Sequence, residues 1–196
     1  MTRARIVTEA RRAFGRKGYA ETSLREIAEA VGIKTPSLYA HFASKEALYE
    51  ATYAEVVVEH TAYFEALARR SSSMEPLDRL HHLLGGIESY YRDRTDYAEF
   101  SLRAAVAEIA PDGEGLREIF LDSESALAEA VREAYDDGVA AGSFTPGDAD
   151  GFTALVFVIM DGLFLQLTHY SPELHRERFD QAWRYLSAIL TASRPR

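Results

Sequence analysis

The sequence predicts an all-α protein of about nine helices, with a small N-terminal headpiece and a larger helical body. Apolar residues recur at helical spacing along almost the whole chain, and no segment alternates in the way of a strand. Glycine, proline and short polar runs separate the helical segments. The chain is 47% hydrophobic, which is enough to bury a core. We expect residues 1–46 to form the headpiece and residues 47–196 to form the body.

The first expected helix spans residues 4–17. Its apolar face consists of Ile6, Val7, Ala10, Ala13 and Phe14. Arg5, Arg12 and Arg16 fall on other faces, so the exposed side is basic. Gly18 follows, and glycine supplies the left-handed residue that commonly ends a helix.

A second helix is expected over residues 24–31. Ser23 and Glu26 form a capping box, in which the serine caps a backbone amide and the glutamate reaches back. Apolar residues then follow at positions i, i+3, i+4 and i+7. Gly32 is expected to end this helix.

A third, short helix is expected over residues 35–42. Thr35 is a side-chain cap and Pro36 suits the first helical position. Leu38 and Phe42 lie one turn apart and would anchor the helix inward. Two short helices joined by a tight turn with glycine form a helix-turn-helix, whose second helix can enter the major groove of DNA. Pairs of amphipathic helices also occur in ordinary helical proteins, so the pattern alone leaves both interpretations open.

The body is expected to contain six helices. Their ranges are 44–67, 76–92, 95–109, 116–135, 152–170 and 172–190. Pro111 and Asp112 mark a break between the third and fourth of these. The segment 152–170 is apolar on nearly every side and must be covered all round. We therefore expect residues 152–170 and 172–191 to form the seam of a homodimer; a fully internal helix is the alternative.

The charge of the chain is unevenly distributed. Residues 1–50 hold nine Lys or Arg and six acidic residues, a net charge of +3, whereas residues 51–196 carry −12. A basic headpiece on an acidic body directs any polyanion contact to one end of the sequence. A random surface imbalance is the alternative. The acidic body argues against a purely architectural DNA binder, which needs broad positive charge.

Several classes of protein are disfavoured. The chain has no cysteine, so disulfides and thiolate metal sites are excluded. The N-terminus lacks the apolar core of a signal peptide, and the run 154–167 is too short to cross a bilayer, so we expect a cytoplasmic protein without membrane contact. No phosphate loop, nucleophile elbow or zinc motif is present, so we expect no enzyme, no catalytic residue, no cofactor and no metal.

The headpiece resembles the TetR family of transcriptional regulators. The resemblance lies in Thr22, the helix 24–31, Gly32-Ile33 and above all the spacing LYxHFxxKxxL from Leu38 to Leu48. It implies an all-helical homodimer of about nine helices per subunit. It also implies a pocket for a small-molecule effector, as yet unknown, and release from a double-stranded DNA operator when that effector binds.

The resemblance also implies roles for individual residues. The side chains that would face DNA from the recognition helix are Lys34, Thr35, Ser37, Tyr39 and His41. Thr22 and Lys45 would contact phosphates at two helix starts, where backbone amides favour anions. Lys45 taken alone is better interpreted as a solvated lysine in the first turn of a helix, and Tyr39 and His41 could be packing residues. The sequence departs from a common form of the family pattern at Pro36 and Ala40.

The body is rich in aromatic residues with polar neighbours, which is typical of a small-molecule site. The predicted ligand-binding residues are Tyr63, Phe64, Tyr91, Phe100, Arg103, Phe120, Phe157 and Asp161. Core packing is the alternative for each of them. For Arg103 and Asp161 the alternative is a structural ion pair or a subunit contact, because charges within apolar helices need partners.

Overall fold

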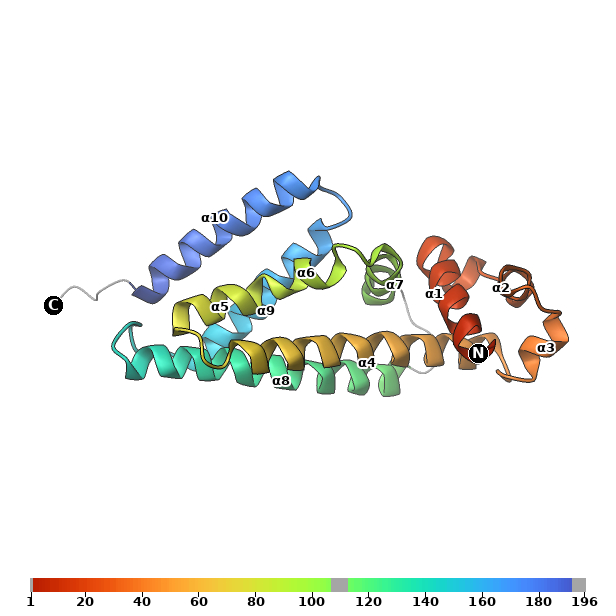
Figure 1. The fold of residues 1–196 in the computed structure, drawn as a ribbon, viewed down its shortest axis with the longest axis horizontal. Coiled ribbons are helices and arrows are strands. Elements are labelled where there is room, and N and C mark those ends of the chain that lie inside the picture. The colour runs from red at the N-terminus through yellow and green to blue at the C-terminus, as the bar shows by residue number, and fades with distance from the viewer. Residues whose placement is uncertain (1, 107–112, 192–196) are drawn as a thin grey trace. The chain divides into compact units, whose positions relative to one another are not determined.

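A computed structural model describes residues 2–106 and 113–191, and within these ranges the chain is helical without a strand (Figure 1). The helices are α1 (Thr2–Glu21), α2 (Leu24–Val31), α3 (Thr35–Tyr39), α4 (Lys45–Ser71), α5 (Pro76–Leu84), α6 (Gly86–Tyr91), α7 (Thr95–Val106), α8 (Gly113–Ala140), α9 (Ala149–Gln166) and α10 (Pro172–Thr191). Gly85 alone separates α5 from α6, so the expectation of about nine helices is confirmed for the described residues. The expected break at Pro111 and Asp112 lies outside them.

The chain packs as two compact units. The first unit contains the residues up to His60 and the segment Asp93–Ser123, so it holds α1 to α3, the first part of α4, α7 and the start of α8. The second unit contains Thr61–Arg92 and the residues from Glu124 onward. This division differs from the expected boundary after residue 46, because α7 packs against α1 although the two helices are far apart in the sequence.

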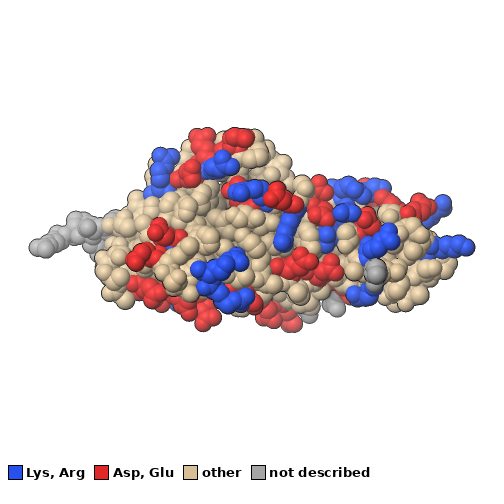
Figure 2. Space-filling model, in the orientation of Figure 1, with Lys and Arg blue, Asp and Glu red and all other residues tan. Residues whose placement is uncertain are grey.

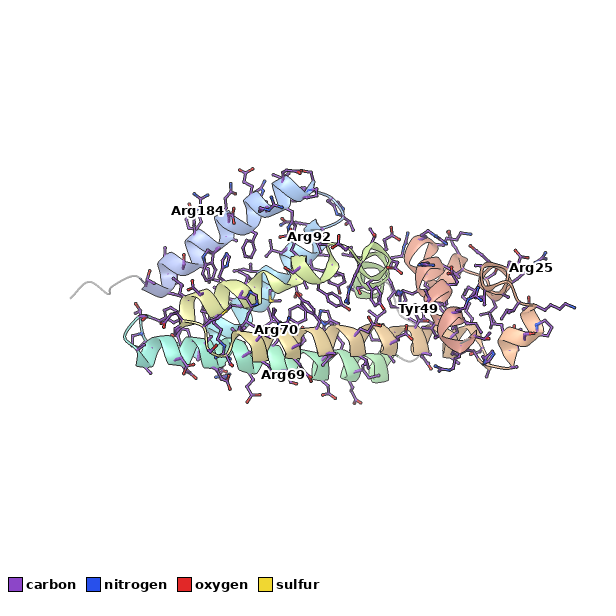
Figure 3. All side chains as sticks on the ribbon, viewed as in Figure 1. Arg25, Tyr49, Arg69, Arg70, Arg92 and Arg184 are labelled. Carbon is purple, nitrogen blue, oxygen red and sulfur yellow. The ribbon has the colours of Figure 1, made fainter. Side chains whose placement is uncertain are left out.

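The core of the first unit is built from the apolar face of α1, as expected. Its fully or almost fully buried members from α1 to α4 and α7 include Ile6, Val7, Ala10, Phe14, Ile27, Ala28, Leu38, Leu48 and Phe100. Tyr49 of α4 (Figure 3) has its ring centroid 5.1 Å from that of Phe14 in α1 and 5.5 Å from that of Phe100 in α7. The rings of α1, α4 and α7 therefore form one packed cluster.

The core of the second unit is aromatic along α4, α6 and α9. The ring of Tyr90 lies 5.0 Å from that of Tyr63 and 4.7 Å from that of Tyr91, and Tyr91 packs 4.9 Å from Phe164. His175 in α10 is buried, and its Nε2 lies 3.0 Å from the carbonyl oxygen of Leu163 in α9. This hydrogen bond ties α10 to α9.

Helix α9 has one covered face and one exposed face. Its buried residues are Phe152, Thr153, Val156, Met160 and Leu163. On the other side Val158 is 67% exposed, and Leu155 and Leu165 are exposed as well. Among the described residues, α9 is the one helix long and apolar enough to cross a membrane, yet only 28% of it is buried. A helix whose outer face meets another subunit has the same properties, so this composition alone does not indicate a membrane span.

Candidate nucleic-acid interface

Helix α2 begins and ends as its sequence predicts. Ser23 has extended backbone angles, and its Oγ accepts a hydrogen bond of 3.1 Å from the amide of Glu26. The Lys17 ammonium, 2.6 Å from the Glu26 carboxylate, and the backbone of Ser23 lower the pKa of Glu26. Gly32 has φ 79°, a left-handed conformation that costs other residues energy, and its amide reaches the carbonyls that end the helix.

Helix α3 is shorter than expected. It spans only Thr35–Tyr39, and Lys34 rather than Thr35 is its N-cap, without a side-chain hydrogen bond. The chain continues as a turn, in which the amides of His41 and Phe42 donate to the carbonyl of Leu38 at 2.9 and 3.1 Å. Leu38 is 0% exposed and Phe42 is buried, so these two side chains hold the segment to the core.

The outer face of this segment carries most of the predicted DNA-binding residues. Lys34, Ser37, Tyr39 and His41 are exposed, and Thr35 is half-buried. Tyr39 is 53% exposed, which is a large exposed fraction for a tyrosine side chain. Figure 2 shows Lys and Arg side chains over α1 to α3, interspersed with acidic ones. The segment therefore presents hydroxyl, amine and imidazole groups of the kind that contact DNA.

Thr22 is buried, and its side chain bonds within the protein. It is only 2% exposed, and its hydroxyl donates to the carbonyl oxygens of Gly18 at 2.7 Å and Ala13 at 3.2 Å. Its single hydroxyl proton is thus used inside the protein. The prediction that the Thr22 side chain contacts a phosphate does not fit this geometry.

Lys45 also has an internal partner, but it keeps free capacity. Its Nζ donates to the carbonyl oxygen of Ala20 at 3.2 Å and lies 4.5 Å from the ring centroid of Tyr19. Partial burial lowers the pKa of its ammonium group. An ammonium has three donors, so the contact with Ala20 leaves two for another acceptor.

Two arginines near the N-terminus join this surface, and the sequence did not single them out as binding residues. The guanidinium of Arg5 donates to the carbonyl of Val31 at 3.1 Å, at the end of α2. The guanidinium carbon of Arg3 lies 4.8 Å from the ring centroid of Phe42. Their basic character was visible in the sequence, whereas their position beside α2 and α3 depends on tertiary packing.

The predicted ligand-binding residues are divided between the two units. Tyr63, Phe64 and Tyr91 belong to the aromatic cluster of the second unit. Phe157 is half-buried in α9. Phe100, Arg103 and Phe120 belong instead to the first unit. Phe100 is 1% exposed in its core and Arg103 bonds to backbone carbonyls of α1, so both have structural partners there.

Asp161 in α9 stands near a second carboxylate, Glu124 in α8. Burial raises the pKa of the Asp161 carboxyl. Burial and the negative charge of Asp161 both raise the pKa of Glu124. Each carboxylate therefore favours its neutral form more than it would in water.

Two family models match the chain. Residues 6–52 match the model of bacterial regulatory proteins of the tetR family, and residues 76–191 match that of the C-terminal part of BetI-type transcriptional repressors. The second match alone covers more than half of the chain. The protein belongs to the TetR family. A TetR-family regulator binds DNA through its N-terminal helix-turn-helix, which in this chain is formed by α2 and α3.

Curated relatives of this TetR-family chain are also regulators. UidR of Escherichia coli K12 is 29% identical over 200 residues, and the match covers 98% of this chain and 94% of UidR. YerO of Bacillus subtilis 168 is 24% identical over 139 residues, covering 69% of this chain and 47% of YerO. This chain thus matches about half the length of YerO and nearly all of UidR.

Solved structures show the same fold. A TetR-family regulatory protein from Rhodococcus RHA1 superposes with a TM-score of 0.74 at 19% identity, covering 98% of both chains. The relatives and the matching folds are transcriptional regulators rather than enzymes.

Proposed function

We propose that this protein is a ligand-responsive transcriptional repressor. It binds a palindromic DNA operator as a homodimer in the cytoplasm, and a small-molecule effector releases it. The exposed face of the segment from Lys34 to His41, held in place by buried Leu38, carries the proposal. In this proposal the N-terminal helices α1 to α3 bind DNA, and the rest of the chain regulates that binding.

The recognition face has the chemistry for both kinds of DNA contact. Lys34 supplies a charge for phosphate, and the Ser37 hydroxyl suits either phosphate or a base edge. Tyr39 presents an exposed phenol on the same short helix. Lys45 keeps two donors beyond its contact with Ala20, so it remains our candidate for a phosphate contact at the start of α4.

The exposed apolar face of α9 supports a dimer. Leu155, Val158 and Leu165 follow one another at helical spacing on that face, and a Cβ atom added to Gly162 would meet open space. In α10, Tyr185 and Ile189 are exposed one turn apart. A twofold dimer would cover these residues with their own copies. Its two recognition helices, about 34–36 Å apart, would then meet successive turns of the major groove.

The effector is proposed to bind among the aromatic residues of the second unit. Support comes from the continuous set of ring contacts that Tyr63, Phe64 and Tyr91 make with Tyr90 and Phe164. Aromatic walls with a few polar groups suit a mostly apolar small molecule. Phe157 and Asp161 in α9 remain candidates for the same role.

The proposal is tested by selecting bound sequences from a random pool of duplex DNA. We expect one palindromic motif, with half-sites one helical turn apart, to be enriched by the purified protein. A library of small molecules is then screened for compounds that release this motif. Enrichment of no sequence at all would refute the function as a DNA-binding regulator.

Replacing Lys45 with alanine is expected to weaken operator binding about tenfold and uniformly across sequences, because the residue contacts phosphate rather than bases. The slope of log K against log salt should flatten by about one unit. Fluorescence anisotropy at several salt concentrations measures both quantities.

Lys17→Ala is the matched control, because it removes the same charge from a lysine that is already paired with Glu26 at 2.6 Å. This control should leave the salt slope nearly unchanged. An unchanged slope for Lys45→Ala would instead assign Lys45 to its internal contacts with Ala20 and Tyr19 alone.

A further inference from the structure

The end of α1 is held by side chains from outside the helix. Gly18 has φ 81° and ψ 170°, so the regular helical backbone is interrupted there, near the end of α1, and such an interruption leaves backbone carbonyls for partners outside the helix. The Thr22 hydroxyl reaches two of the carbonyls at this end, those of Ala13 and Gly18. Two others are reached from α7.

Arg103 of α7 supplies that contact. Its Nε donates to the carbonyl oxygen of Gly15 at 2.6 Å, and its Nη2 donates to that of Arg16 at 2.8 Å. A cation at a helix C-terminus is favoured by the helix dipole, and the planar guanidinium fits two neighbouring acceptors. Arg103 therefore binds the backbone of α1 and not its side chains.

A second arginine joins the same two helices, but its side chain extends from α1 to α7. Arg11 of α1 is 6% exposed, and its guanidinium donates to the Asp96 carboxylate of α7 at 3.0 and 3.2 Å. It also lies 3.5 Å from the Glu55 carboxylate of α4 and 3.7 Å from the ring centroid of Tyr97. Burial raises the pKa of Glu55, and Arg11 opposes that effect.

The two helices also approach closely between these anchors. A Cβ atom added to Gly15 would lie 3.1 Å from the amide nitrogen of Phe100 and 3.3 Å from the Cβ of Glu99. A side chain at position 15 would require the neighbouring part of α7 to move by a few tenths of an ångström. The α1–α7 contact is thus fixed at three points along α1, namely Arg11, Gly15 and the carbonyl of Arg16.

The end of α1 is coupled to α2 and α3 of the same chain over a short length of sequence. Thr22 bonds to the end of α1 and is followed directly by Ser23, the N-cap of α2. Lys17, next to the carbonyl that Arg103 holds, pairs with Glu26 in the first turn of α2. A shift of this end of α1 would therefore move the start of α2.

We propose that Arg103 is a positioning residue for DNA binding, which sets the placement of α1, and with it α2 and α3, from α7. The inference rests on the proposed function, in which α2 and α3 contact the operator.

The test compares operator binding by Arg103→Gln with that of the wild type. We expect the Kd to rise about tenfold for every DNA sequence, because two charge-assisted hydrogen bonds that hold α1 are lost. The salt slope should stay unchanged, because Arg103 touches carbonyls and no phosphate. Arg103→Lys, whose ammonium can still donate to the carbonyls, should recover part of the affinity. Arg69→Gln is the charge-matched control, because Arg69 is an exposed residue of the second unit (Figure 3) whose ion pair is with Glu65, one turn away in α4.

Gly15→Ala is the second variant, and it changes the α1–α7 distance without changing charge. Alanine favours the helix more than glycine does, so weaker DNA binding by this variant would arise from the crowded contact with Phe100. We expect its Kd to rise severalfold, again with an unchanged salt slope. All variants are measured well below their own Tm, so that the fraction folded is the same.

Each remaining outcome decides against the inference. A Kd within twofold of the wild type for both Arg103→Gln and Gly15→Ala, with the proteins folded, would leave Arg103 a purely structural role. A salt slope reduced by about one for Arg103→Gln would make Arg103 a phosphate contact instead. If the wild type enriches no DNA sequence, the proposed function fails before the variants are compared.

Discussion

Replacing Leu38 with alanine is expected to destabilise the first unit by about 3–4 kcal/mol and to abolish operator binding. Leu38 is 0% exposed and is the one buried residue of α3. A helix of five residues has no stability of its own, so its position depends on this side chain and on the neighbouring Phe42. Urea unfolding followed by circular dichroism measures the loss, and anisotropy measures the binding.

Ser37→Ala is the matched control on the same helix. Ser37 is exposed, so its replacement should change the free energy of unfolding by less than about 0.5 kcal/mol. It should instead alter the preferred operator sequence, because a hydroxyl facing the groove is lost. A stability of Leu38→Ala within this margin of the wild type would show that α3 is held by other contacts.

The local features of the headpiece were predictable because they depend on neighbouring residues. Ser23 and Gly32 bound α2 as the sequence indicates, since a cap and a left-handed glycine act within one turn. The start of α3 was predicted less well. Thr35 was expected to be its cap, but it lies inside the helix, and Lys34 precedes it with extended backbone angles. Proline at position 36 suits either arrangement near the first turn.

The packing of α7 on α1 was not predictable from spacing. The two helices are separated by α2 to α6, and no local pattern specifies which distant helix covers α1. One signal was present in the sequence. Arg11 lies four residues after Val7 and three before Phe14, within the apolar stripe, so a buried partner was required for its charge. The partner, Asp96, could be identified only from the structure.

The aromatic residues illustrate the same limit. Phe100 and Tyr91 both lie on the apolar faces of helices that follow one another in the sequence, and the same role was predicted for both. In the structure Phe100 packs against Tyr49 in the first unit, whereas Tyr91 packs against Phe164 in the second. Residue type identifies a buried ring, but only the tertiary contacts show which core it joins.

Replacing Val158 with glutamate is expected to separate the proposed dimer into monomers with no loss of monomer stability. Val158 is 67% exposed in α9, so a carboxylate there remains solvated in a single chain. In the proposed twofold seam the same substitution buries two carboxylates, one from each protomer, at a cost of several kcal/mol. The dimer Kd should rise on the order of a thousandfold. Sedimentation velocity over a range of concentrations measures this change.

Operator binding should fall together with dimerisation, because each protomer then binds one half-site without the help of the other. Met74→Glu is the control, since it adds the same charge at an exposed apolar residue in the turn before α5. This control should remain dimeric and bind the operator with unchanged affinity. If Val158→Glu stays dimeric as well, the exposed face of α9 is not the subunit seam. In that case the proposed dimer forms through another surface, since the proposed palindromic operator takes one recognition helix from each of two protomers.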